Sequence, residues 1–199
     1  LNTNLPLVET EWFCFLCSDD YFLSDAIHKI QNLMVYGDVG FVLSKFQSVN
    51  SDSSERYDDA QDLLKLISQY GFILTPEQML LSLLRYGSLN GNLSGMMLHK
   101  SLWDHIGGFK EDWLHAADWD WLVNACKLCR TQVNEQCLVA IRTHKNQLSA
   151  HNQFNGSAQS EAIAVIKELR KHPVVQQHWL SLWWASCLLQ HHLWNLLFK

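Results

Sequence analysis

The stretch that decides the fold is Glu11-Trp12-Phe13-Cys14-Phe15-Leu16-Cys17-Ser18-Asp19-Asp20, in which an apolar run passes directly into two carboxylates. Residues 12–17 are too few for a helix, and their composition is typical of a buried strand. Ligands of open α/β sheets bind beyond the carboxyl ends of strands, so Asp19 and Asp20 are candidate site residues. A Mg²⁺ or Mn²⁺ ion between them and a substrate phosphate would relieve their mutual repulsion. A solvated turn is the alternative interpretation.

Outward from this stretch, strand-like and helix-like segments alternate. Thr75, Pro76 and Gln78 form a helix-starting capping box, and glycines end two of the helical patterns. This alternation predicts an α/β layered domain. The expected strands are 39–43, 96–99 and 137–141, and the expected helical segments are 24–36, 58–70, 75–86, 101–106, 118–129 and 157–171.

The composition excludes several classes of protein. Of 199 residues, 48% are hydrophobic and 18% are charged, which is unlike a disordered or low-complexity chain. The net charge of -5 argues against nucleic acid as a partner, because binding phosphates requires a basic surface. The length suits one domain, which we assign to residues 1–172, with a Trp-rich helical tail at 173–199.

The tail allows two interpretations. It carries Trp179, Trp183, Trp184 and Trp194 among leucines, interrupted by Gln190-His191-His192. We expect it to pack on the domain or to contact a protein partner. A peripheral membrane contact is the alternative, since Trp favours the headgroup layer, although such helices usually carry a basic face. No run is as long as the roughly 18 apolar residues that a spanning helix needs.

The six cysteines are expected to be reduced thiols, which suggests a cytoplasmic setting. Cys126 and Cys129 form a CxxC within a helical pattern. A zinc site would need two more ligands at suitable spacing, so we favour buried free thiols over a metal site.

Two further segments carry candidate chemistry. Asp118-Trp119-Asp120 opens a helix shortly after Gly107-Gly108-Phe109, and an Asp there is either a helix cap or a general base. Arg142-Thr143-His144-Lys145 follows the last strand and is either a solvated loop or a site for a metal or diphosphate. The tryptophans around Asp118 are either core residues or a stacking surface for a sugar.

In this order and spacing, these segments resemble the family 2 glycosyltransferases of the GT-A fold, a Rossmann-like architecture. Residues 11–20 look like the strand ending in the family's DxD-type metal motif, and residues 107–111 look like its GGF(D/K)E turn. Residues 117–122 look like its ED-W segment. Arg142-Thr143-His144 with Ser149 looks like its R-x-H-x(n)-S stretch. The resemblance covers roughly residues 5 to 165.

The resemblance implies an inverting transfer of a sugar from a nucleotide-sugar donor to a hydroxyl of a sugar or lipid-linked acceptor. The reaction would serve the synthesis of cell-surface polysaccharide or glycoconjugate. The implied roles are a Mg²⁺ or Mn²⁺ site at Asp19, Asp20 and His144, a diphosphate contact at Arg142, a catalytic base at Asp118, and an acceptor side at Trp119, Gly107 and Gly108.

The chain departs from the family pattern at several points. Cys17 stands where many members have the first Asp of DxD, and Ala117 stands where a Glu commonly precedes the base. A Q-x-x-R-W segment is absent, so processive synthesis is not implied. In the family, the DxD strand follows a βαβ half that binds the nucleotide. Because the corresponding run begins near residue 12 here, we expect the chain to lack that N-terminal half. A non-catalytic remnant of the fold, acting as a protein-interaction module, is the alternative function.

Overall fold

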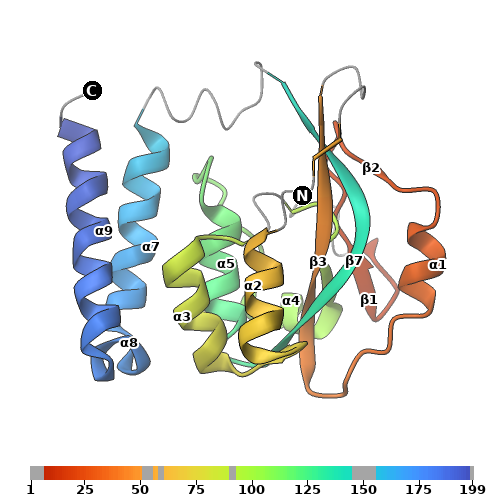
Figure 1. Ribbon diagram of the computed structural model, residues 1–199, viewed down its shortest axis with the longest axis horizontal. Coiled ribbons are helices and arrows are strands. Elements are labelled where there is room, and N and C mark those ends of the chain that lie inside the picture. The colour runs from red at the N-terminus through yellow and green to blue at the C-terminus, as the bar shows by residue number, and fades with distance from the viewer. Residues whose placement is uncertain (1–6, 51–55, 58–60, 90–92, 145–155, 198–199) are drawn as a thin grey trace.

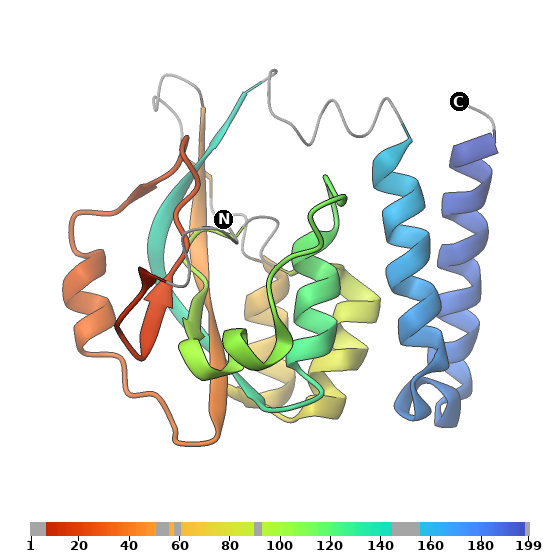
Figure 2. The ribbon, with the colours of Figure 1, turned by 180° about the vertical axis from the view of Figure 1, so that it is seen from behind.

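A computed structural model describes residues 7–50, 56–57, 61–89, 93–144 and 156–197. Its elements form layers (Figures 1 and 2). A curled sheet has one small helix, α1 (Ala26–Gln31), on its outer side. Helices α2 (Gln61–Tyr70), α3 (Pro76–Tyr86) and α5 (Ala117–Ala125) lie on the other side. Beyond them lie α7 (Ser157–Lys171), α8 (Pro173–Gln177) and α9 (Trp179–Leu197). The α/β class and the C-terminal helix are as the sequence predicts.

The sheet is mixed, and its centre is one long parallel pair. β3 (Val39–Asn50) runs parallel to β7 (Arg130–Thr143), and every other pairing is antiparallel. The strand order is β1-β6-β3-β7-β2, with β4 on β3 and β5 on β7. The remaining strands are β1 (Trp12–Cys14), β2 (Tyr21–Phe22), β4 (Arg56–Tyr57), β5 (Ile73–Leu74) and β6 (Met97–His99).

The strongest local signals in the sequence produce the expected elements. Thr75 caps α3, with its hydroxyl accepting from the Gln78 backbone and the Gln78 side chain accepting from the Thr75 backbone. Gly71 follows α2 with a positive φ of 80°, a conformation that favours glycine. Helix α7 has the predicted bounds. A short α4 (Lys100–Ile106) stands where a helical turn is expected.

Two expectations near the N-terminus are wrong in extent. The strand expected over residues 12–17 ends at Cys14 and is half-buried, because β1 is a short edge strand. The helix expected to carry Ile27 and Met34 ends at Gln31. Its only buried residue is Ala26, and Met34 lies beyond it, 83% exposed. Helix α1 therefore adds little to the core.

The main core lies between the sheet and helices α2, α3, α4, α5 and α7. An aromatic cluster within it joins β1 to the segments around residues 103–121. Trp103 stacks on Trp121 with centroids 5.4 Å apart and contacts Phe109 edge-on at 4.9 Å. Phe13 and Phe15 also contact Trp103. These contacts fix the end of β1 against the start of α5. They also hold the beginning of residues 17–20, which follow β1 and are called the carboxylate turn below.

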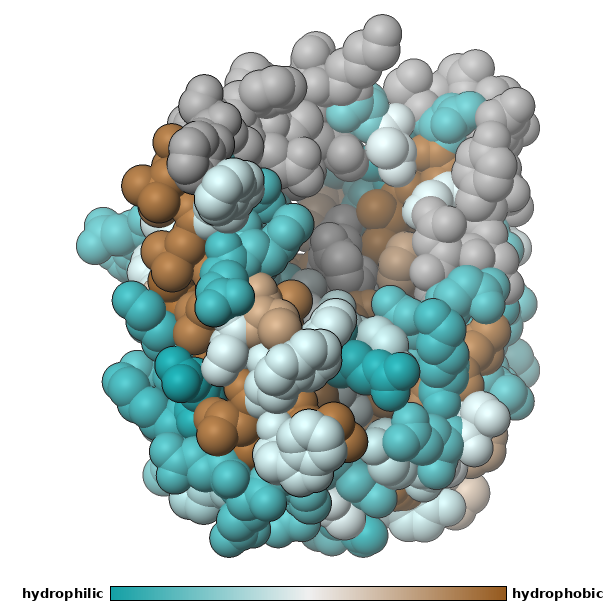
Figure 3. Space-filling model, turned by 60° about the vertical axis from the view of Figure 1, so that its left-hand side comes forward, coloured by the Kyte–Doolittle hydropathy of each residue, from teal (hydrophilic) through white to brown (hydrophobic). Residues whose placement is uncertain are grey.

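Helix α9 packs through a narrow stripe and leaves much of its apolar surface exposed. Only Ala185 and Leu189 are buried, whereas Trp179 is 73% exposed. Figure 3 shows a face on which apolar and polar side chains are interspersed. Within the described ranges, no helix combines the length and hydropathy needed to cross a bilayer.

Candidate functional site

Asp20 joins three segments that are far apart in sequence. Its Oδ1 accepts a hydrogen bond from the Arg142 backbone N–H (3.0 Å), and its Oδ2 accepts one from the Ser94 hydroxyl (2.6 Å). The Ser94 oxygen in turn accepts from the Cys17 backbone N–H (2.9 Å). Asp20 is buried, so these bonds compensate for the loss of water around its carboxylate. The carboxylate turn is thus tied to the end of β7 and to the loop before β6.

Asp19 is the exposed member of the pair. Its Oδ2 lies 3.1 Å from His144 Nε2, and the two side chains are 57% and 26% exposed. The Arg142 guanidinium lies over the Tyr21 ring. The structure therefore brings together Asp19, Asp20, Arg142 and His144. Lys145 and Ser149 fall outside the described residues.

The side chains of Asp19 and His144 fit a cation that is shared with a bound ligand better than a metal ion held by the protein alone. Among the described residues, no three or more His, Cys, Asp or Glu side chains form a group that could hold a metal. Asp19 and His144 supply one carboxylate oxygen and one imidazole nitrogen. Mg²⁺ commonly binds one or two protein carboxylates and completes its shell with water and substrate phosphates. The residues present fit such a site.

Asp118 lies in the first turn of α5, half-buried, and lines a cavity. Its Oδ1 accepts from the Trp119 backbone N–H (2.8 Å). Burial raises the pKa of Asp118, and the Trp119 N–H, His115 and a hydrogen bond from Ser88 oppose that shift without cancelling it. A carboxylate with a raised pKa is a better proton acceptor than an ordinary Asp.

Cys17 lies within electrostatic reach of both predicted carboxylate groups. Burial is the main reason that the pKa of its thiol is raised, and the charges of Asp20 and Asp118 raise it further. Aromatic contacts of Phe15 with Trp103 and Phe109, and of Trp103 with Trp121, join the segment before Asp19 and Asp20 to α5. Asp19, Asp20, Arg142 and His144 are not among the described residues that line the cavity beside Asp118.

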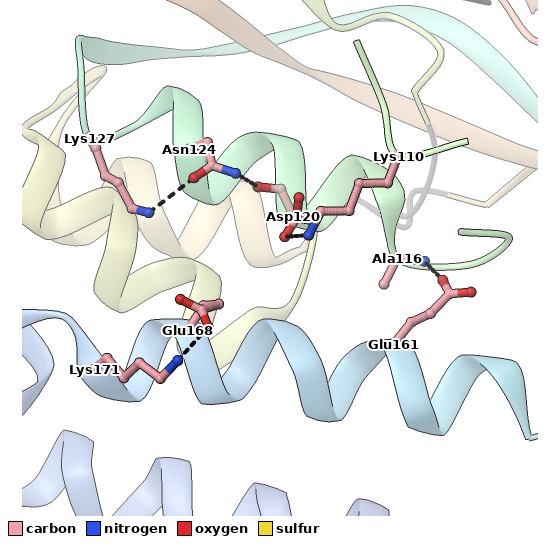
Figure 4. Close-up of polar contacts among 8 residues, drawn as sticks. All are labelled: Lys110, Ala116, Asp120, Asn124, Lys127, Glu161, Glu168 and Lys171. Carbon is pink, nitrogen blue, oxygen red and sulfur yellow. Dashed lines mark hydrogen bonds and ion pairs between the residues drawn. The ribbon is translucent and has the colours of Figure 1, made fainter. Parts of the chain in front are cut away.

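Asp120, the second carboxylate of the Asp-Trp-Asp segment, is already paired. Lys110 Nζ lies 2.8 Å from Asp120 Oδ1 (Figure 4). The same Nζ lies 4.1 Å from the centroid of the Trp113 ring. The ion pair neutralises Asp120. Asp118 is thus the carboxylate of this segment that remains for proton transfer.

The glycine turn before α5 has a structural role. Gly107 has a φ of 88°, and its carbonyl accepts a hydrogen bond from the Trp121 indole (3.0 Å). Phe109 then enters the aromatic cluster. Of the three residues predicted on the acceptor side, Trp119 lines a cavity beside Asp118, whereas Gly107 and Gly108 are not among the described residues that line it.

This cavity has a volume of about 460 Å³, within the usual range for small-molecule sites. Its walls come from the end of α3, the start of α5, and helices α7 and α9. The α7 and α9 residues were not predicted as site residues. Gln159 gives no signal in the sequence, and the His191-His192 pair stands out only as a polar break in the tail. The described lining residues are Tyr86, Gly87, Ser88, His115, Ala116, Asp118, Trp119, Ala158, Gln159, Ala162, His191, His192 and Asn195.

Glu161 of α7 holds the segment that leads into α5. Its carboxylate accepts three consecutive backbone N–H groups, from Leu114 (2.8 Å), His115 (2.8 Å) and Ala116 (2.7 Å). Figure 4 shows this side chain reaching from α7 to the start of α5. Because α5 has no capping side chain of its own, Glu161 supplies the anionic partner that the helix start requires.

The described cysteine thiols do not form a metal or disulfide site. All six cysteines are free. Burial raises the pKa of Cys14 and of Cys129 to about 11 and raises that of Cys126 further, so these thiols stay protonated at neutral pH. Cys126 is the buried member of the set, and the other five cysteines are half-buried.

Comparison with known proteins gives a structural likeness only. No family model and no curated protein matches the chain. Solved structures do match. Residues 1–349 of S. aureus TarS in complex with UDP give a TM-score of 0.58 at 14% identity, over 96% of this chain and 48% of that one. The complex of the same protein with UDP-GlcNAc gives 0.58 at 14%, over 98% and 51%. This chain spans about half of those structures, and its fold is glycosyltransferase-like.

Proposed function

We propose that this chain carries the metal-binding and acceptor-binding part of an inverting glycosyltransferase that uses a nucleotide-sugar donor. The observation that carries the proposal is that the fold joins two carboxylate environments. Asp19 pairs with His144 just beyond β7. Aromatic contacts between Phe15 and Phe109 and between Trp103 and Trp121 connect the segment before Asp19 to α5, which carries the half-buried Asp118. The structural neighbours bind UDP and UDP-GlcNAc, which supports a uridine diphosphate sugar as donor.

On the donor side, Asp19 and His144 would hold Mg²⁺ or Mn²⁺, and the bound ion would stabilise the negative charge that develops on the departing diphosphate. Arg142 adds a positive charge at the same edge. Asp20 has both oxygens hydrogen-bonded within the protein, so we assign it to positioning rather than to ligation. It holds the turn that presents Asp19.

On the acceptor side, Asp118 accepts the proton of the attacking hydroxyl. The hydroxyl oxygen forms a bond to the anomeric carbon while the bond from that carbon to the diphosphate oxygen breaks. The electron pair of the broken bond leaves with the nucleotide diphosphate. A single displacement inverts the anomeric configuration. The partial burial of Asp118 favours this proton transfer, because it raises the pKa of the carboxyl group. A role in polysaccharide or glycoconjugate synthesis in the cytoplasm is part of the proposal.

Calorimetric titration with Mn²⁺ and UDP tests the donor side. Because we expect the chain to lack the half that binds the nucleotide, UDP should bind through its diphosphate, with low but saturable affinity in the presence of Mn²⁺ and much more weakly after chelation of the metal. Asp19→Asn should weaken the binding by about 10-fold or more, which is the usual effect of altering a metal's surroundings. Asp25→Asn is the control, because Asp25 is an exposed carboxylate paired with Lys29 on α1. Equal affinity with and without metal, or in Asp19→Asn, would contradict the proposal.

A protein-interaction module is the second candidate function, and the exposed tryptophans of α9 favour it. Trp179, Trp183 and Trp194 together present a large aromatic surface to solvent. Absence of Mn²⁺-dependent UDP binding in the intact chain would favour this candidate over the transferase.

A further inference from the structure

The outer side of helix α9 is an exposed apolar face without charged residues. Its large side chains follow spacings of three, four and eleven residues, which are close to whole helical turns and place them on one side of the helix. The stretch 173–197 contains no Asp, Glu, Lys or Arg. Figures 1 and 2 show α9 as the outermost element on its side of the molecule. The members of this face, each more than half exposed, are Trp179, Leu180, Trp183 and Trp194.

Helix α7 adds positive charge beside this face. Its C-terminal end and the start of α9 border a hollow of about 490 Å³. Leu182, the α9 residue of this hollow, lies one turn after Trp179 and directly before Trp183, so the hollow adjoins the first turns of the apolar face. The described lining residues are Lys167, Arg170, Lys171, Gln176 and Leu182. The fold thus places three cations next to exposed tryptophans in a chain whose net charge is -5.

The ordinary roles of these cations leave positive charge available. Arg170 and Lys171 lie in the last turn of α7, where positive charge offsets the helix dipole. Lys171 also pairs with Glu168 at 2.7 Å, but both side chains are more than half exposed, and such pairs contribute little to stability. Neither Lys167 nor Arg170 forms an ion pair with a residue that the structure describes. The hollow therefore keeps a net positive charge.

An anionic phospholipid surface matches both halves of this arrangement. Tryptophan indoles favour the headgroup layer of a bilayer, and binding at that layer grows with the apolar area buried and with attraction to anionic lipids. Lysine binds lipid phosphates as a point charge, and arginine can bind them through two parallel hydrogen bonds. The sequence of α9 by itself lacks the basic component that interfacial helices usually carry. The tertiary structure supplies that component from α7.

We propose that the apolar face of α9 and the cations Lys167, Arg170 and Lys171 of α7 form one peripheral docking surface for membranes that contain anionic phospholipid. The inference does not depend on the proposed transferase function. It goes beyond that function by assigning one side of the molecule to a lipid surface and by giving the Trp-rich tail a role.

Cosedimentation of the full chain with lipid vesicles tests the electrostatic half. The chain should bind vesicles of phosphatidylcholine with about 30% phosphatidylglycerol, and should bind pure phosphatidylcholine at least roughly 10-fold more weakly. About 0.5 M NaCl should reduce the binding, because salt screens exposed charges. Lys167→Ala combined with Arg170→Ala should weaken it by roughly 10- to 30-fold, since each cation near an anionic membrane strengthens binding about fivefold.

The matched control for the charge variant is Lys65→Ala combined with Arg85→Ala. It removes the same two kinds of charge from exposed positions on α2 and α3, outside the proposed surface. Its affinity for the anionic vesicles should change by less than about twofold, because contributions to membrane binding fall off within a Debye length.

Trp183→Ala tests the apolar half. It should weaken binding to the anionic vesicles by roughly 10-fold or more, because a 59% exposed indole would lose the area that it buries in the headgroup layer. Phe72→Ala, an exposed aromatic position between α2 and β5, is the control and should bind like the unmodified chain. The tryptophan emission of the unmodified chain should move to shorter wavelength when the anionic vesicles are added.

Three results would overturn the proposal: no binding to the anionic vesicles, equal binding to neutral ones, or unchanged binding in the variant that lacks Lys167 and Arg170. A chain that binds neither vesicle but forms dimers that Trp183→Ala dissociates, as measured by sedimentation equilibrium, would also overturn it and assign the face to a protein contact. Titration with Mn²⁺ and UDP is a separate readout. Failure of UDP binding with vesicle binding retained would contradict the transferase and leave the docking surface in place.

Discussion

Three neighbouring aspartates show how the surroundings of a residue decide its chemistry. Asp20 is buried but saturated with hydrogen bonds, and Asp120 is paired with Lys110. Asp118 is half-buried with fewer compensating contacts, and this partial burial raises its pKa. Of the three, Asp118 is thus the one whose surroundings increase its affinity for a proton. That property is what a general base requires, and it costs stability.

Asp118→Asn should therefore abolish transfer and stabilise the fold at neutral pH. Burial penalises the ionised carboxylate in the folded state, so the native protein loses stability as pH rises above the ordinary Asp pKa of 3.8 through the raised value. The neutral amide avoids this loss and keeps an oxygen for the Trp119 N–H. The gain in the free energy of unfolding should be larger at about pH 7.5 than at about pH 4, where it should nearly vanish. Urea denaturation at both pH values measures it.

The control for this prediction is Asp25→Asn. Lys29 lowers the pKa of the exposed Asp25, so the shift there has the opposite sign, and the amide should bring no gain at either pH. A destabilised Asp118→Asn at about pH 7.5 would contradict the view that Asp118 is a strained, buried charge.

At the scale of the helices, α5 depends on α7 for its N-terminus. Three backbone N–H groups before α5 bond to the Glu161 carboxylate, which is 8% exposed. Glu161→Ala should lower the free energy of unfolding by about 3 kcal/mol, because it removes three charge-assisted hydrogen bonds, one of them to the buried Ala116 N–H. Glu168→Ala on the same helix removes an exposed pair with Lys171 and should change stability by less than about 0.5 kcal/mol.

Thermal unfolding followed by circular dichroism compares the two variants. Similar midpoints would show that the Glu161 contact is not needed to hold the start of α5. A larger effect of Glu161→Ala would explain how Asp118 is oriented although α5 lacks a capping side chain.

Local patterns in the sequence predicted some elements in detail and others only in part. The capping box at Thr75 and the bounds of α7 follow from spacing within one helix, so they could be predicted. The full lengths of β3 and β7 could not. Their ladder pairs residues about 90 positions apart, and this long-range pairing extends β7 back to Arg130, a segment whose composition does not indicate a strand.

Some residues of the candidate site could be located from the sequence, and others could not. Asp19, Asp20, Arg142 and His144 could be located because carboxylates and basic residues follow strand-like runs, and the structure brings them together. Gln159 and His192 could not, because their contribution depends on how α7 and α9 pack against α5. In the sequence Glu161 is an ordinary helix residue. Only the tertiary structure shows that its carboxylate accepts hydrogen bonds from the backbone just before α5.

At the scale of the whole molecule, α9 connects the cavity to the outer layer of the fold. Figures 1 and 2 show α7 and α9 side by side, outside α2, α3 and α5. If residues 173–199 formed a separate tail, the cavity would depend on a loosely attached wall. The burial of Ala185 and Leu189 instead supports one cooperative unit that includes α9.

Leu189→Ala tests whether α9 folds with the rest of the chain. Leu189 is 8% exposed, and truncating a buried leucine costs about 2–5 kcal/mol, partly through the cavity that it leaves. If α9 belongs to the same cooperative unit, far-ultraviolet circular dichroism and tryptophan fluorescence should report one transition, shifted by the same amount. Trp179→Ala, at an exposed position of the same helix, should shift it by less than about 0.5 kcal/mol. Two separate transitions, with only the earlier one moved by Leu189→Ala, would mean that α9 is an independent tail. The cavity beside Asp118 would then lack a fixed wall on the α9 side.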